Sequence, residues 1–142
     1  MHVSVNGPAG VTILARGVEL LTPAEAWDGI YRRVGCLNFS LRSARRPFVG
    51  VSPASSAWLV SFLRQQGYIV EIAENDLAHD VYLDRSRFEH KDERALLALI
   101  ERNSFPLVRL GRWPDGARSA LCVTGDIDAL TLWDYGLRFL GN

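Results

Sequence analysis

Two aspartates one residue apart, Asp126 and Asp128, are the residues of this 142-residue chain whose types and spacing best suit chemistry. They follow an apolar run, residues 120–124 (ALCVT), and precede a second apolar segment, residues 129–141. If the run is a strand, both carboxylates lie where it passes into a helix, which is where α/β sheets bind their ligands. One carboxylate can then bind a divalent metal while the other acts as a base. The alternative is that Asp126 or Asp128 caps the final helix.

A tryptophan–proline lead-in stands before this pair, because residues 112–124 are RWPDGARSALCVT, and the pair itself is Asp-Ile-Asp-Ala. The combination resembles the first catalytic motif of polysaccharide deacetylases of the NodB-homology type. Members of that family often open with a Trp-Pro-x-Gly lead-in, a small apolar strand and a paired-aspartate motif, which one branch writes as Asp-x-Asp-Ala. The resemblance covers residues 112–136. The matching positions are Trp113, Pro114, Gly116, Ala117, Ala120, Asp126, Ile127, Asp128 and Ala129.

The resemblance implies a metal-dependent hydrolase that removes N- or O-linked acetyl groups from a glycan, or that cleaves a related carbon–nitrogen bond. Carried over by position, it makes Asp126 the general base and Asp128 a ligand of a divalent metal, with zinc the expected ion. In such a site the base accepts a proton from metal-bound water as the water attacks the acyl carbonyl, and the metal stabilises the oxyanion.

The chain departs from the family at its histidines. The family supplies two further metal ligands from an HxxxH box downstream, whereas the histidines here are His2, His79 and His90, none with that spacing. Because a catalytic zinc is typically held by three protein ligands, Asp128 alone does not make a site. We therefore expect an incomplete or inactive deacetylase-like homologue, whose partner is a glycan substrate or a protein chain that completes the site. The alternative is a non-enzymatic α/β module that binds a ligand or another protein.

A second group of potential metal ligands lies in the middle of the chain. His79 and His90 have three aspartates nearby, Asp76, Asp80 and Asp84. Imidazole and carboxylate groups are both zinc ligands, so these residues could form a metal cluster. The alternative is a solvated polar connection between two elements, which is what such loops usually are.

A serine-rich segment, residues 50–58 (GVSPASSAW), resembles an anion-binding strand-to-helix turn. Exposed backbone N–H groups and the hydroxyls of Ser52 and Ser55 would meet there at the start of a helix. The segment has neither a glycine-rich approach nor a P-loop lysine, so the alternative is that its serines only cap the helix.

The composition excludes several classes of protein. Sixteen basic and sixteen acidic residues cancel, so no nucleic-acid-binding surface is expected. No apolar run approaches the roughly 20 residues that a membrane span needs, and the N-terminus does not resemble a signal peptide. Cys36 and Cys122 form no CxxC motif and are expected to be reduced and packed in the core. These features predict a cytoplasmic protein.

Alternating strand and helix signals predict a single α/β domain over residues 1–142, with a layered, mainly parallel sheet flanked by helices. The clearest signal is a βαβ unit in which an apolar strand is followed by a helix capped by Ser52 and ended by Gly67, and then by a second strand. A helix is also predicted from Thr22, followed by proline, to Gly35. The expected strands are residues 11–17, 36–41, 47–51, 68–73, 81–84, 106–110 and 120–124, and the expected helices are 22–35, 52–67, 90–103 and 129–141.

Overall fold

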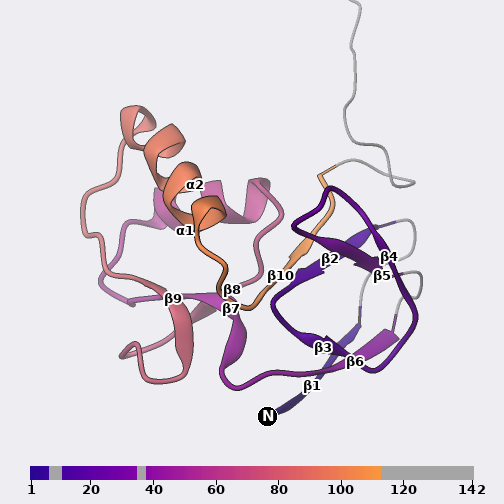
Figure 1. Cartoon of the computed structure of the whole chain (residues 1–142). Helices are drawn as coiled ribbons and strands as arrows, with labels where there is room; N and C mark the ends of the chain where they lie inside the picture. The colour runs from indigo at the N-terminus through magenta and orange to yellow at the C-terminus, as the bar shows by residue number, and fades with distance from the viewer. Residues whose placement is uncertain (7–10, 35–37, 113–142) are drawn as a thin grey trace, which may run out of the picture.

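The structure is a computed structural model that describes residues 1–6, 11–34 and 38–112. One half of the described chain is built from short strands and the other from three strands and two helices, with β10 running between the halves (Figure 1). The elements are β1 (His2–Asn6), β2 (Ile13–Arg16), β3 (Glu19–Leu20), β4 (Ala24–Ala26), β5 (Arg32–Val34), β6 (Asn38–Arg42), β7 (Arg46–Val51), α1 (Ala57–Gln65), β8 (Val70–Ile72), β9 (His79–Leu83), the 3-10 helix η1 (His90–Asp92), α2 (Glu93–Arg102) and β10 (Leu107–Leu110).

The predicted fold class, a layered and mainly parallel α/β sheet, is wrong. The described strands form three small sheets, in the orders β1-β6-β3, β10-β2-β5-β4 and β8-β7-β9. All pairings in the first two sheets are antiparallel, and only the β8-β7-β9 sheet is parallel. The prediction failed because the described residues before β7, expected to hold a helix, instead form strands that pair with one another and with β10.

The helix predicted from Thr22 to Gly35 is a hairpin of β4 and β5 in its described part. Asp28 and Gly29 make the turn, because the Asp28 carboxylate accepts hydrogen bonds from the N–H groups of Ile30 and Tyr31 at 3.1 and 2.8 Å. Gly29 has a φ of 83°, a left-handed conformation that glycine adopts without steric cost. An Asp-Gly pair is a strong hairpin signal, and here it prevails over the capping pattern that begins at Thr22.

The predicted βαβ unit is confirmed in its order and pairing, since β7 and β8 are parallel neighbours joined by α1. The helix begins later than expected: Ser56, not Ser52, is the N-cap, and its hydroxyl accepts a hydrogen bond from the Trp58 N–H at 3.2 Å. The helix end is as predicted, because Gly67 follows it with a φ of 87°.

The connection from β8 to β9 is short for a link between parallel strands. Both strands pair with β7, on its opposite edges, and residues 73–78 carry the chain from one edge to the other. The hydroxyl of Tyr82 donates to the Ala73 carbonyl at 3.2 Å, and the N–H of Arg46 donates to the Ala78 carbonyl at 2.8 Å. These bonds tie the connection to the sheet, where a parallel crossover usually needs a dozen residues or more.

Two hydrophobic clusters lie on the two sides of β7. Val49 and Val51 join the cluster under α1 and α2, whereas Phe48 joins the cluster of the strand-rich half. The two clusters also share β10, because Leu107 packs in the first and Val108 in the second. Successive side chains of a strand point to opposite faces, so β7 and β10 hold the halves together.

The predicted strands at 36–41, 81–84 and 106–110 correspond to β6, β9 and β10, and the helix at 90–103 corresponds to η1 and α2. None of the helices in the described ranges has the length and apolar character that a bilayer crossing requires. The elements predicted at 120–124 and 129–141 lie outside the described residues, as do Cys36 and Cys122.

Candidate functional site

The residues with the strongest sequence signal, Asp126 and Asp128, lie outside the described residues, so their roles as base and zinc ligand stay predictions. Within the described ranges, no group of three or more His, Cys, Asp or Glu side chains is placed to hold a metal ion.

The second predicted metal group is divided among separate ion pairs. His90 Nδ1 lies 3.0 Å from the Glu93 carboxylate, and Asp80 pairs with Arg45 at 3.2 Å. His90 is exposed at the start of α2, whereas His79 is buried in β9. The structure thus supports the alternative, in which these residues are parts of ordinary polar connections.

His79 of β9 is held by a carboxylate of β8, on the other side of β7. Its Nε2 lies 2.9 Å from Glu71, and the same carboxylate accepts two hydrogen bonds from the guanidinium of Arg46. Hydrogen bonding from Arg46 is the largest cause that lowers the pKa of Glu71, and the bond to His79 adds to it against the opposing effect of burial. Glu71 is therefore an ionised anchor. The other ring nitrogen, Nδ1, is buried and has no hydrogen-bond partner in the described structure.

The serine-rich segment uses its hydroxyls locally. Ser52 accepts from the Ala54 N–H at 3.2 Å, and Ser55 accepts from the Arg85 N–H at 3.0 Å while donating to the Leu83 carbonyl. These bonds fix the turn before α1 to the end of β9. The capping alternative is therefore wrong for Ser52 and Ser55, since Ser56 caps α1, but each of the two hydroxyls already has a backbone partner.

The most concentrated group of charged and polar side chains is one that no sequence motif predicted. We call it the junction cluster: Arg16 of β2, Tyr31, Tyr68, Glu101 of α2 and Arg109 of β10. Glu101 is its centre, accepting from Arg16 at 3.1 Å, from Arg109 at 3.2 Å, from Tyr31 at 2.9 Å and from the hydroxyl of Tyr68. The cluster joins α2 to the strand-rich half of the molecule.

Arg16 closes the C-terminal end of α2. Its side chain is 2% exposed and donates to the backbone carbonyls of Ile100 at 2.7 Å, Glu101 at 3.3 Å and Phe105 at 3.3 Å. The last carbonyls of a helix lack partners within the helix, and a cation at this end also interacts favourably with the helix dipole. The free-energy cost of burying the Arg16 guanidinium is therefore offset by its hydrogen bonds to carbonyl groups that would otherwise be unpaired.

The two tyrosines of the junction cluster are neutral hydrogen-bond donors. Burial is the largest cause that raises the pKa of both phenols, and the charge and hydrogen bond of Glu101 raise each further. The guanidinium of Arg109 lies over both rings, 4.7 Å from the centroid of Tyr31 and 5.7 Å from that of Tyr68. The rings thus fix the plane of Arg109, as cation–π contacts do.

Arg109 is the residue of the junction cluster that can still bind a ligand from solvent. Its side chain is 24% exposed, and its Nε is buried without a hydrogen-bond partner in the described part of the chain. Two arginines against one carboxylate leave the cluster with an excess of positive charge. A planar guanidinium that is partly exposed suits a carboxylate or phosphate oxygen.

The sequence did carry one signal for this cluster. Arg16 and Arg109 each stand in a short apolar strand segment, ILAR and LVRL, where an arginine is uncommon unless it is paired. Compared with known proteins, the chain matches no family model, no curated protein and no solved structure. The site is thus interpreted from its own geometry.

Proposed function

We propose that this chain is a polysaccharide-deacetylase-like protein that is incomplete or inactive as a hydrolase, and that its described residues form a non-catalytic module. The lead-in at Trp113 and the pair Asp126 and Asp128 carry the likeness to the family. The substrate class of a completed site would be an acetylated glycan, and the second metal-binding part would come from a complementing chain.

The burial of His79 and its bond to Glu71 support the proposal that the metal site is incomplete. The family's metal box needs two histidines, and the chain has His2, His79 and His90. His79 is 4% exposed, is bound to Glu71 and packs against the backbone of Gly50. To become a ligand it would have to leave the space in which it is buried, because Nε2 is bound to Glu71 and Nδ1 is buried as well.

Zinc titration by calorimetry tests this proposal. We expect the full chain to bind zinc weakly, with no difference between the wild type and Asp128→Ala. Asp84→Ala is the matched control, because Asp84 is an exposed aspartate outside the motif. Tight zinc binding that Asp128→Ala abolishes and Asp84→Ala leaves intact would contradict the incomplete site and support a working metal centre.

A binding role without catalysis is a second candidate, and the partly exposed guanidinium of Arg109 favours it. The ligand would be a small anion with two acceptor oxygens, since the guanidinium is already fixed by the rings of Tyr31 and Tyr68. The exposed part of Arg109 gives such an anion access, and the excess positive charge of the junction cluster attracts it.

Melting curves with inorganic phosphate and with succinate test the second candidate. We expect either anion to raise the melting temperature of the wild type but not of Arg109→Lys, which keeps the charge and loses the planar group. Ser52→Ala is the control. A shift that depends on Ser52 instead of Arg109 would place the ligand at the strand end before α1 and overturn this assignment.

A further inference from the structure

The outer edge of β8 is an unpaired strand edge in the described structure. β8 pairs only with β7 there, using the Ile69 carbonyl, which accepts from the Val49 N–H at 3.0 Å, and the Ala73 N–H, which donates to the Val51 carbonyl at 3.0 Å. Because backbone groups alternate along a strand, the N–H and C=O groups of Val70 and Ile72 point away from β7. They are available to another strand.

An apolar groove runs alongside this edge, between α1 and the end of β8. Ile72 is 56% exposed at its floor, and Val70 packs partly against the cluster under α1. Exposed apolar area beside an unpaired strand marks a surface for strand addition. The groove is lined by Ala57, Val60, Ser61, Arg64, Gln65 and Ile72.

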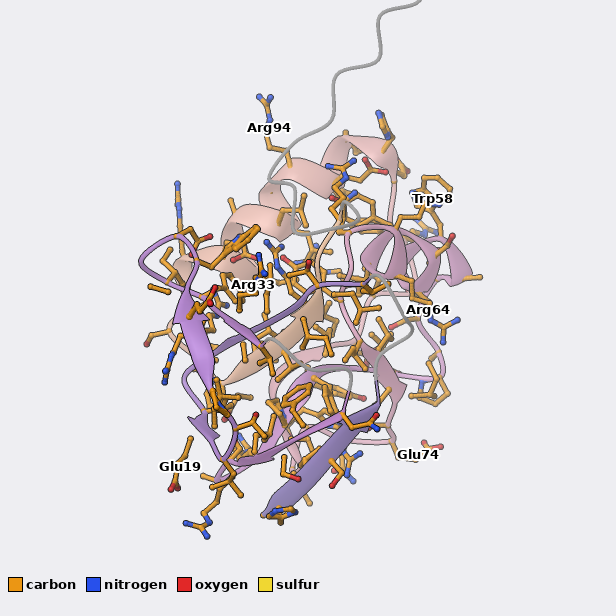
Figure 2. All side chains as sticks on the ribbon, turned by 90° about the vertical axis from the view of Figure 1, so that its right-hand side faces the viewer. Glu19, Arg33, Trp58, Arg64, Glu74 and Arg94 are labelled. Atoms are coloured by element: carbon orange, nitrogen blue, oxygen red, sulfur yellow. The ribbon has the colours of Figure 1, made fainter. Side chains whose placement is uncertain are left out.

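Two opposite charges stand at the two ends of the edge. Arg64 is in the last turn of α1, where its carbonyl accepts from the Gly67 N–H just before β8, and Glu74 follows β8 by two residues. Both side chains are exposed, and neither has a partner among the described residues. Figure 2 shows Trp58, Arg64 and Glu74 along one side of the molecule, so the groove and both charges face the same way.

We propose that the occupant of this edge is a second copy of the chain, whose β8 pairs antiparallel with the first across a twofold axis at Glu71. In that register Val70 faces Ile72 of the second copy, and the two residues exchange backbone hydrogen bonds. Their side chains also meet on the α1 side, where they cover the exposed Ile72. The β8-β7-β9 sheet thereby becomes one continuous sheet through both copies.

The same register explains the charges. An antiparallel pairing centred on Glu71 places residue 74 of one copy beside Tyr68 of the other, where the added pairing ends because the Tyr68 N–H donates to the Leu63 carbonyl and Tyr68 bridges to Arg109. The carbonyl of Arg64 accepts from the Gly67 N–H, directly before this position. A twofold axis repeats every contact, so Arg64 and Glu74 form two equivalent ion pairs at the ends of the interface. A partner without this charge order, or a parallel strand, would leave both side chains unmatched.

One contact in this register opposes association. The two Glu71 side chains face each other across the axis, and like charges directly opposite in a sheet are destabilising. Each carboxylate is, however, held by its own Arg46 and His79 on the far side of the sheet from α1. The interface is also small, so we expect a weak dimer.

Sedimentation of the full chain over a range of concentrations tests the dimer. We expect Arg64→Glu and Glu74→Arg each to raise the dimer Kd at least about tenfold, since each creates two like-charge contacts. The double variant, Arg64→Glu with Glu74→Arg, exchanges the charges and restores the wild-type Kd. Arg94→Glu is the matched control, because Arg94 is exposed on α2, away from the groove.

A second pair of variants separates β8 from the other sheet edge. Ile72→Lys should weaken the dimer, whereas Leu99→Lys, a 50%-exposed position beside β9, should leave it intact. A wild type that stays monomeric overturns the proposal, as does a dimer that only Leu99→Lys dissociates. Slow amide exchange at Val70 and Ile72 in a monomer would instead assign the edge to another segment of the same chain.

Discussion

The imidazole of His79 occupies the space that a side chain at Gly50 would need. A Cβ at residue 50 would lie 2.7 Å from Cγ and 2.8 Å from Nδ1 of His79. The ring is held in this place by Glu71, which faces Gly50 across the β7–β8 pairing. The glycine is thus fixed by packing and not by backbone conformation.

We predict that Gly50→Ala lowers the free energy of unfolding by about 2–3 kcal/mol, because the ring must move and its bond to Glu71 must distort. Urea denaturation measures the loss. His79→Ala in the same chain removes the obstruction, so the double variant should lose less than the sum of the two single variants. Strictly additive losses would show that the ring and the glycine are not coupled.

The βαβ unit was predictable because its determinants are local. The apolar strand that became β7, the stripe of Leu59, Phe62 and Leu63, and the left-handed Gly67 lie within one continuous stretch. Parallel pairing then follows from strand, helix and strand in succession. Only the N-cap of the helix was predicted at the wrong residue. Ser52 and Ser56 are equally suitable N-cap residues by type, and the sequence does not show which of them has the backbone conformation of an N-cap.

The strand-rich half was mispredicted because two local signals competed. Thr22 begins a good capping pattern, and Ala26, Ile30 and Val34 have helical spacing. In the structure Val34 is buried and Ile30 is 59% exposed, so the helical face does not exist. Pairing of β5 with β2 decides the outcome, and that contact cannot be seen in a local window.

The junction cluster could not be predicted as a unit. Arg16 and Glu101 are 85 residues apart, and no spacing rule connects them. Each arginine is unusual in its strand, but its partner is set by the packing of α2 on the sheets. Asp126 and Asp128 are the opposite case. Their motif is local and easily recognised in the sequence, but the two residues lie outside the described structure.

Arg16 should contribute far more to stability than an arginine in a surface ion pair. We predict that Arg16→Ala lowers the free energy of unfolding by about 3 kcal/mol, because it leaves helix-end carbonyls without a donor and removes one of the two guanidinium groups that pair with Glu101. Arg42→Ala is the matched control, since Arg42 pairs with Glu19 while 62% exposed, and it should cost less than about 1 kcal/mol. Equal losses in chemical denaturation would contradict a structural role for the junction cluster.

The two buried tyrosines predict a loss of stability in alkali. Their raised pKa means that the folded state keeps both phenols protonated while the unfolded chain ionises near the ordinary value of 10.0. This contribution is complete below pH 10 and is lost as the pH rises above it, because the unfolded state then holds fewer protons. The free energy of unfolding should therefore fall as the pH rises above about 10.

Phenolate absorbance measures the same effect directly. In the wild type, part of the tyrosine absorbance should appear only as the protein unfolds, and the variant Tyr31→Phe with Tyr68→Phe should lose that late component. Each single substitution should also cost about 1–2 kcal/mol, since it removes a hydrogen bond to a charged group. Tyr82→Phe, whose hydroxyl bonds a backbone carbonyl, is the control and should leave the late component unchanged.

Glu71 predicts a loss of stability in acid. Hydrogen bonds from Arg46 lower its pKa from the ordinary value of 4.5, so its contribution is complete above that pH. The contribution is lost as the pH falls through the lower, folded-state pKa, because the unfolded chain then binds more protons. Glu71→Gln should lower the free energy of unfolding by about 1–2 kcal/mol at pH 7, since it removes a charge-assisted pair that is partly exposed.

The difference in the free energy of unfolding between the wild type and Glu71→Gln should shrink as the pH falls below 4.5, because the wild-type carboxyl then becomes neutral as well. Urea denaturation at intervals between pH 7 and pH 3 measures this convergence. Glu25→Gln, at an exposed position in β4, is the control, and its free energy of unfolding should change with pH in parallel with that of the wild type. If the curves for the wild type and for Glu71→Gln kept a constant separation down to pH 3, the Arg46–Glu71–His79 contacts would not be the source of the acid sensitivity.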